Sequence, residues 1–124
     1  EDTALALGDA LRKALSDKVG IERYGFALPM DESSAKVLID LGGRPFFKFD
    51  AEFSRDSVGD ISTEMVPHFF KSLAESLKAN IHIEARGENV HHLTECIFKA
   101  FARALKSAIA KNDNNGLPST KGVL

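Results

Sequence analysis

The residues with the clearest chemistry form the run Val90-His91-His92-Leu93-Thr94-Glu95, two adjacent histidines and a carboxylate at the predicted start of a helix. His91 and Glu95 stand four apart on one helix face, so both can reach one ion. His92 points about 100° away, because a helix has 3.6 residues per turn. The spacing therefore predicts two metal ions, each completed from elsewhere. An exposed histidine pair that happens to precede a glutamate is the alternative interpretation.

Other residues bear on this hypothesis. His68 lies off the apolar stripe of its predicted helix and is a candidate ligand, although alone it is more typical of a surface histidine. His82 faces outward on a predicted strand, and we interpret it as structural or solvated. Imidazole and carboxylate ligands without thiolate favour manganese, iron or zinc, with octahedral manganese a reasonable candidate. The single Cys96 is more typical of a buried apolar residue than of a nucleophile.

Basic residues that could bind an anion are scattered along the chain. Arg23 lies in the first predicted strand, Arg44 follows a Gly-Gly turn, and Lys99 lies one turn beyond the glutamate of the histidine run. Each of them alone is more typical of a surface charge. The tail Pro118-Ser119-Thr120-Lys121-Gly122 combines two hydroxyls, a cation and permissive backbone, which suits a phosphate.

Composition bounds the class of protein. With 124 residues, 44% hydrophobic and 27% charged, the chain is typical of one soluble globular domain. A net charge of -2 with mixed signs argues against nucleic acid as a partner, and no apolar run approaches the roughly 20 residues of a membrane span. A lone cysteine fits a reducing compartment, so we expect a cytoplasmic protein, or a plastid one in a plant.

Hydrophobic periodicity predicts a fold that positions these residues. The predicted elements are, in order, a helix that starts at Glu1 and is ended by 17–20, strands over 21–28, 35–41 and 47–53, a helix over 61–79 beginning near Pro67, a strand over 81–86, and a helix over 90–111 capped by Asn89. We expect the first three strands to form a meander and 112–116 to be a loop. The order βββαβα after the first helix predicts an α+β fold, with helices on one face of a mixed four-stranded sheet.

The first helix is explained by an internal repeat. Its residues match the last helix at one fixed offset: Glu1, Ala6, Ala10, Leu11 and Ala14 align with Glu95, Ala100, Ala104, Leu105 and Ala108. The pattern indicates a duplicated unit, with 1–17 as the last helix of a truncated first half, 18–111 as the second half and 112–124 as a phosphate-binding tail. Chance similarity between two helices rich in alanine and leucine is the alternative.

Eight short motifs are distributed over the whole chain: Glu1-Asp2-Thr3, Leu28-Pro29-Met30-Asp31-Glu32, Gly43-Arg44-Pro45, Ser62-Thr63-Glu64-Met65, His68-Phe69-Phe70, His91-His92-x-x-Glu95, Phe98-Lys99-Ala100-Phe101 and 117–124. Together they resemble the imidazoleglycerol-phosphate dehydratase family. Pro67 departs from the family's usual glutamate and Thr120 from its usual serine. The resemblance implies that each half has the ribosomal protein S5 domain 2-like fold, and that this chain is a C-terminal fragment.

The resemblance also implies a site. His68, His91 and Glu95 would bind one manganese ion, and Glu1 and His92 the other, at subunit interfaces of a homo-oligomer of 24 chains. Arg23, Arg44, Lys99, Ser119, Thr120 and Lys121 would surround the substrate phosphate. The implied reaction is the dehydration of imidazoleglycerol phosphate to imidazole acetol phosphate in histidine biosynthesis, with the substrate held as its imidazolate by two Mn²⁺ ions. The catalytic base is not assigned, because the family's candidate lies before Glu1 and support for Glu32 is weak.

Two alternatives belong to other classes of protein. One is a non-catalytic structural protein assembled by metal, and the other is a binding module for phosphate ligands. Since the first copy of the histidine motif would precede Glu1, we expect this stretch alone to be inactive.

Overall fold

The computed structural model describes residues 1–27, 29–112 and 116–124. The three helices are α1 (Asp2–Leu15), α2 (Met65–Leu77) and α3 (Val90–Ala108). The strands are β1 (Tyr24–Gly25), β2 (Pro29–Met30), β3 (Ser33–Asp40), β4 (Phe46–Asp50), β5 (Ser57–Val58), β6 (Ile61–Ser62) and β7 (Asn80–Arg86). The expected strand over 21–28 and loop over 112–116 reach residues outside the described part, namely Leu28 and residues 113–115.

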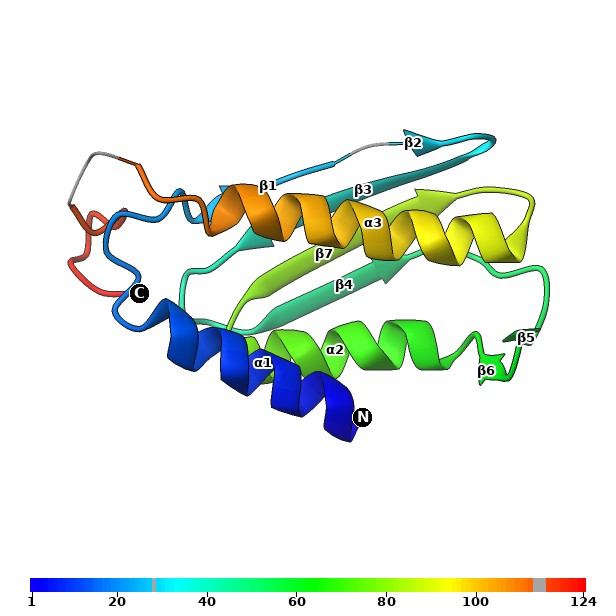
Figure 1. Ribbon diagram of the computed structural model, residues 1–124, viewed down its shortest axis with the longest axis horizontal. Coiled ribbons are helices and arrows are strands. Elements are labelled where there is room, and N and C mark those ends of the chain that lie inside the picture. The colour runs from blue at the N-terminus through cyan, green and yellow to red at the C-terminus, as the bar shows by residue number, and fades with distance from the viewer. Residues whose placement is uncertain (28, 113–115) are drawn as a thin grey trace.

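The main sheet has the order β1-β3-β7-β4, with β2 also paired to β3 (Figure 1). The expected meander is therefore wrong, since β7 lies between β3 and β4. β7 is antiparallel to β3 but parallel to β4. Parallel neighbours need a crossover connection, and α2 provides it between β4 and β7. Hydrophobic periodicity predicted the strands, but tertiary packing determines which of them pair.

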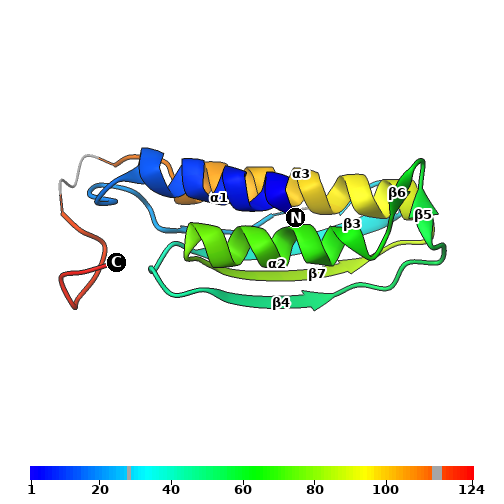
Figure 2. The ribbon, with the colours of Figure 1, turned by 90° about the horizontal axis from the view of Figure 1, so that it is seen from below.

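The helices form one layer on one face of this sheet, as Figure 2 shows. β3 and β7 turn alternate residues toward them, so that Val37 lies opposite Ile83 and Ile39 opposite Ile81. Phe70 of α2 and Ile97 of α3 are completely buried against this face. The expected class, α+β with helices on one face of a mixed sheet, is confirmed.

α2 and α3 begin where the sequence predicts. Pro67 lies in the first turn of α2, where a missing N–H is tolerated because that group has no partner within the helix. The Asn89 side chain caps α3 by accepting the backbone N–H groups of His91 and His92. The spacing along α3 predicts a buried stripe of Leu93, Ile97, Phe101, Leu105 and Ala108. All of them are buried except Leu105, which is only partly buried.

The buried side of α1 is not formed by the leucines whose spacing predicts the helix. Ala4 and Gly8 are the buried residues of this helix, and Leu7 is 41% exposed. Small residues let α1 lie close to α2, and the Ser76 hydroxyl donates to the Leu5 carbonyl at 2.7 Å. A Cβ atom at Gly8 would come within 2.7 Å of the Ser76 Cβ. The close approach of the α1 and α2 backbones therefore determines which side of α1 contacts α2. The spacing of the leucines does not reveal this approach.

We predict that Gly8→Val lowers the free energy of unfolding by about 1–3 kcal/mol, because the added atoms push α1 away from α2. Urea unfolding measures the loss. Ala10→Val in the same helix is the control, since this exposed position has only the helix-propensity cost of about 0.5–0.7 kcal/mol. Equal losses in both variants would contradict the close packing of α1 on α2.

Candidate metal and phosphate sites

The first turn of α3 places its two histidines in different directions. Their ring centroids are 6.2 Å apart and the ring planes are inclined at 63°. His91 Nε2 lies 3.5 Å from Glu95 Oε2, one turn along the same face. The carboxylate also accepts a hydrogen bond from the ammonium group of Lys99, and this hydrogen bond lowers the pKa of Glu95 below its ordinary value. One edge of the helix thus presents an imidazole, a carboxylate and a cation.

His92 meets a carboxylate from a different part of the chain. Its Nδ1 atom lies 3.0 Å from Oε2 of Glu32, which belongs to the turn between β2 and β3. This hydrogen bond is the main cause that lowers the pKa of Glu32 to about 2. The same contact raises the pKa of His92. No spacing rule could have linked these residues, because 60 positions separate them along the chain.

The remaining candidate ligands pair with each other. His68, at the start of α2, places its Nε2 atom 3.2 Å from Oε2 of Glu1, just before α1. The resemblance implies that Glu1 binds the same ion as His92, whereas in this structure it lies beside His68. Within residues 1–27, 29–112 and 116–124, histidine, cysteine and acidic side chains form no group of three around a possible ion. The described chain therefore offers pairs of ligands, and their assignment to ions stays a prediction.

The C-terminal tail, residues 116–124, lies at the other end of α3 (Figure 1), and a cavity that we call the tail pocket lies against it. Most of the predicted phosphate-binding residues meet there, in a cavity of about 350 Å³ lined by Arg23, Gly42, Gly43, Arg44, Ser119, Thr120, Lys121, Val123 and Leu124. Lys99 is absent from this lining and instead pairs with Glu95. One chain thus gathers five of the six residues and leaves the sixth beside the histidines.

Arg23 is already engaged within the tail pocket. Its Nε and Nη2 atoms donate to the two carboxylate oxygens of Asp40 at 2.6 and 3.1 Å. Its Nη1 atom donates to the Pro118 carbonyl at 2.9 Å, which ties the tail to the sheet. Asp40 raises the pKa of Arg23 through this hydrogen bond. Sequence analysis missed Asp40, because a carboxylate at the end of a strand gives no signal of its partner.

Two remaining residues with possible chemistry are structural. His82 lies on the open face of the sheet, where its ring packs 5.4 Å from that of Phe46. Cys96 is completely buried, as the sequence predicted, and burial raises the pKa of its thiol.

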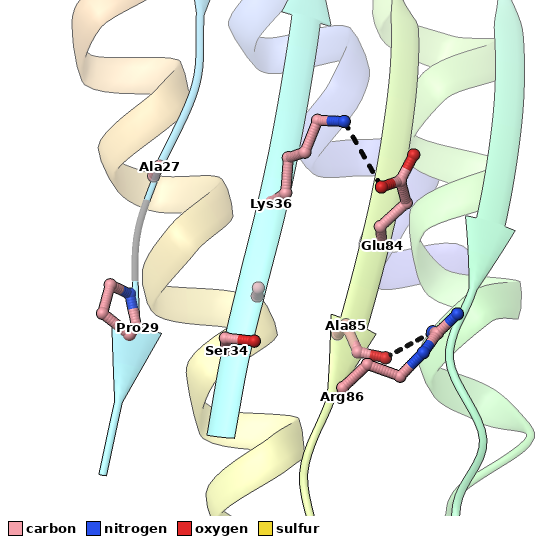
Figure 3. A pocket seen from close by; sticks show the side chains of 8 residues that line it. Ala27, Pro29, Ser34, Lys36, Glu84, Ala85 and Arg86 are labelled. Atoms are coloured by element: carbon pink, nitrogen blue, oxygen red, sulfur yellow. Dashed lines mark hydrogen bonds and ion pairs between the residues drawn. The ribbon is translucent and has the colours of Figure 1, made fainter. Parts of the chain in front are cut away.

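A hollow on the sheet face that the helices leave uncovered is a weaker candidate for a binding site (Figure 3). Its charged side chains are paired with one another or with β4. Lys36 reaches Glu84 at 3.3 Å, and Arg86 reaches Asp50 at 2.9 Å. These contacts are typical of a solvated sheet face. In the part of the chain that the structure describes, no helix has the length and apolar character needed to cross a bilayer.

The fold and the site define a class: an α+β protein that presents imidazole–carboxylate pairs at the ends of its helices. The family model described as imidazoleglycerol-phosphate dehydratase matches residues 1–105. The chain therefore belongs to the imidazoleglycerol-phosphate dehydratase family.

Curated relatives share this similarity over the whole chain. It is 57% identical to the histidine biosynthesis bifunctional protein HisB of Actinobacillus pleuropneumoniae and covers 34% of that protein. It is likewise 57% identical to HisB of Spirosoma linguale, covering 33%. The chain thus spans about a third of the length of the curated relatives it matches.

Solved structures of the family have the same fold. The imidazoleglycerol-phosphate dehydratase of Staphylococcus aureus matches with a TM-score of 0.86 and 40% identity, over 90% of this chain and 66% of that one. The enzyme of Pyrococcus furiosus matches with a TM-score of 0.86 and 36% identity, over 99% and 68% of the two chains.

We predict that Glu32→Gln lowers the pKa of His92 toward its ordinary value of 6.5, measured by NMR titration of histidine-labelled protein without metal. The carboxylate of Glu32 stabilises the fold above its ordinary pKa of 4.5 and loses this effect as pH falls toward about 2. Protonated His92 stabilises the fold below pH 6.5, and this stabilisation is lost as pH rises through its raised pKa. The stability lost in the variant is therefore greatest between pH 4.5 and 6.5. An unchanged His92 pKa would contradict the contact.

We predict that Asp40→Asn lowers the free energy of unfolding by about 1–3 kcal/mol, because it leaves a largely buried guanidinium without its charged acceptor. Asp50→Asn is the matched control. The Arg86–Asp50 pair joins two strands, but its side chains are 65% and 50% exposed, so the expected loss is much smaller than at Asp40. Denaturant unfolding compares the variants. A loss at Asp50 as large as at Asp40 would be the contrary result.

Proposed function

We propose that the protein containing this chain is a lyase that dehydrates imidazoleglycerol phosphate to imidazole acetol phosphate in histidine biosynthesis. The observation that carries the proposal is the diverging pair His91 and His92 with Glu95 one turn along α3. Membership of the dehydratase family and similarity to histidine biosynthesis bifunctional proteins support it. The chain covers about a third of those relatives, so we expect it to hold only part of the site and to be inactive alone.

The proposed cofactor is a pair of manganese ions. His68, His91 and Glu95 would hold one ion, and Glu1 and His92 the other. The donor set fits, because these side chains carry imidazole and carboxylate groups while the thiol of Cys96 is buried in the core. When bound, such ions supply Lewis acidity that stabilises the substrate imidazole as its anion.

The substrate phosphate would be bound by the basic residues. Lys99 lies beside the metal-ligand candidates of its own chain, whereas Arg23, Arg44, Ser119, Thr120 and Lys121 line the tail pocket. α3 has 19 residues, about 28 Å at 1.5 Å per residue, which is longer than a substrate of this size. The tail of one copy must therefore meet the histidines of another if both sets contact one substrate.

This distance supports a homo-oligomer with active sites at its interfaces, for which we propose 24 chains. An interface site also explains why the candidate metal ligands of one chain lie in pairs, since residues from outside this stretch would complete the coordination of each ion. A lone, buried cysteine is compatible with the proposed cytoplasmic location.

The test is turnover of imidazoleglycerol phosphate by the complete gene product with added Mn²⁺. We predict that Glu95→Gln lowers kcat/KM by more than about 100-fold, because even groups behind metal ligands contribute about 10- to 100-fold. Glu75→Gln, on the exposed side of α2, is the control and leaves turnover unchanged.

The oligomer is measured in the same samples by analytical ultracentrifugation. Lost turnover in a variant that still assembles supports the dehydratase. No turnover by the metal-loaded wild-type protein would overturn the proposal. If Glu95→Gln abolished assembly but not turnover, a non-catalytic structural protein assembled by metal would replace the dehydratase as the proposed function. Binding of phosphate analogues without metal would favour a binding module for phosphate ligands.

A further inference from the structure

We propose that Glu32 is a positioning residue that fixes the ring orientation and the tautomer of His92, an inference that rests on the proposed metal role of that histidine. The Nδ1–H of His92 donates to Glu32, which leaves Nε2 as the nitrogen with a lone pair. The ring is thereby prepared to bind an ion through one particular atom.

The contact differs from those of the other candidate ligands. In His68 and His91 the nitrogen that faces a carboxylate is Nε2, at 3.2 and 3.5 Å. In His92 it is Nδ1, at 3.0 Å from Glu32. A histidine that binds metal through one ring nitrogen commonly donates the other N–H to a carboxylate or a carbonyl, which orients the ring and raises its basicity. Glu32 has this relation to His92.

The Glu32 carboxylate is itself held through its second oxygen. Oε1 accepts the hydroxyl of Ser33 at 3.0 Å and the backbone N–H of Asn89 at 3.2 Å. Both oxygens are therefore used, so the carboxylate cannot rotate without breaking hydrogen bonds. Only 35% of its side chain is exposed.

Close packing fixes these supporting groups. Ser33 is 1% exposed and lies against Gly87, where an added Cβ would come within 2.2 Å of the serine hydroxyl oxygen. Asn89 both donates to Glu32 and caps the helix that carries His92. The turn before β3 and the start of α3 are thus joined into one unit that sets the direction of a single imidazole.

The test first asks for the tautomer of His92 in the complete protein, free of metal and substrate. Solid-state NMR of ¹⁵N-histidine-labelled protein, above the pKa of His92, should show the proton on Nδ1, with the signal assigned through His92→Gln. Because neither metal nor substrate is present, this result is independent of whether the protein turns over imidazoleglycerol phosphate. A proton on Nε2 in the wild-type protein would overturn the inference.

The second measurement is Mn²⁺ affinity, by titration calorimetry with MnCl₂. Glu32→Ala should weaken the affected site by about 10- to 100-fold. Glu32→Gln keeps an acceptor for Nδ1–H and should lose less, so the pair separates positioning from charge. Glu88→Gln, an exposed neighbour of Asn89, is the control and should leave affinity unchanged. Unchanged affinity in a folded Glu32→Ala protein would refute the role, and if that variant fails to fold, the wild-type tautomer and Glu32→Gln decide.

Discussion

The N-terminal turn of α3 constrains everything else in the candidate site. Two adjacent residues of a helix point about 100° apart, so His91 and His92 cannot easily serve the same ion. The cap at Asn89 fixes where the helix begins, and therefore where both imidazoles point. The sheet contributes the second constraint, because the turn before β3 brings Glu32 to His92. The site is thus built by joining one helix end to one strand turn.

The length of α3 imposes a division between the two ends of the molecule. His91, His92 and Glu95 lie near its start, and the C-terminal tail, which lines the tail pocket, lies beside its end (Figure 1). Arg23 adds a positive charge to that pocket. It also helps to shape it, because it joins Asp40 of β3 to the backbone of the tail. A single copy therefore separates the proposed metal-binding and phosphate-binding groups, and assembly becomes part of the proposed chemistry.

Local patterns in the sequence predicted local structure well. Asn89 caps α3, Pro67 lies in the first turn of α2, and the apolar stripes of β7 and α3 face the core, because each depends on neighbours within a few residues. The errors concern long-range choices. β4 joins β7 instead of β3 through the crossover of α2. The contact face of α1, at Ala4 and Gly8, was not predicted, because the close approach that small residues permit becomes evident only in the packed structure.

The candidate site divides in the same way. The i, i+4 relation of His91 to Glu95 follows from helix geometry alone, whereas the partners Glu32 and Asp40 become evident only once the strands are paired. Glu1 could be linked to the histidine motif through the internal repeat, but its contact with His68 depends on how α1 lies on α2.

The most direct test of the account is X-ray diffraction at the manganese absorption edge from crystals of the complete protein grown with Mn²⁺. The account predicts two anomalous peaks near the start of α3, one beside His91 and Glu95 and the other beside Nε2 of His92. A single peak shared by both histidines, or no peak at this helix end, would contradict it.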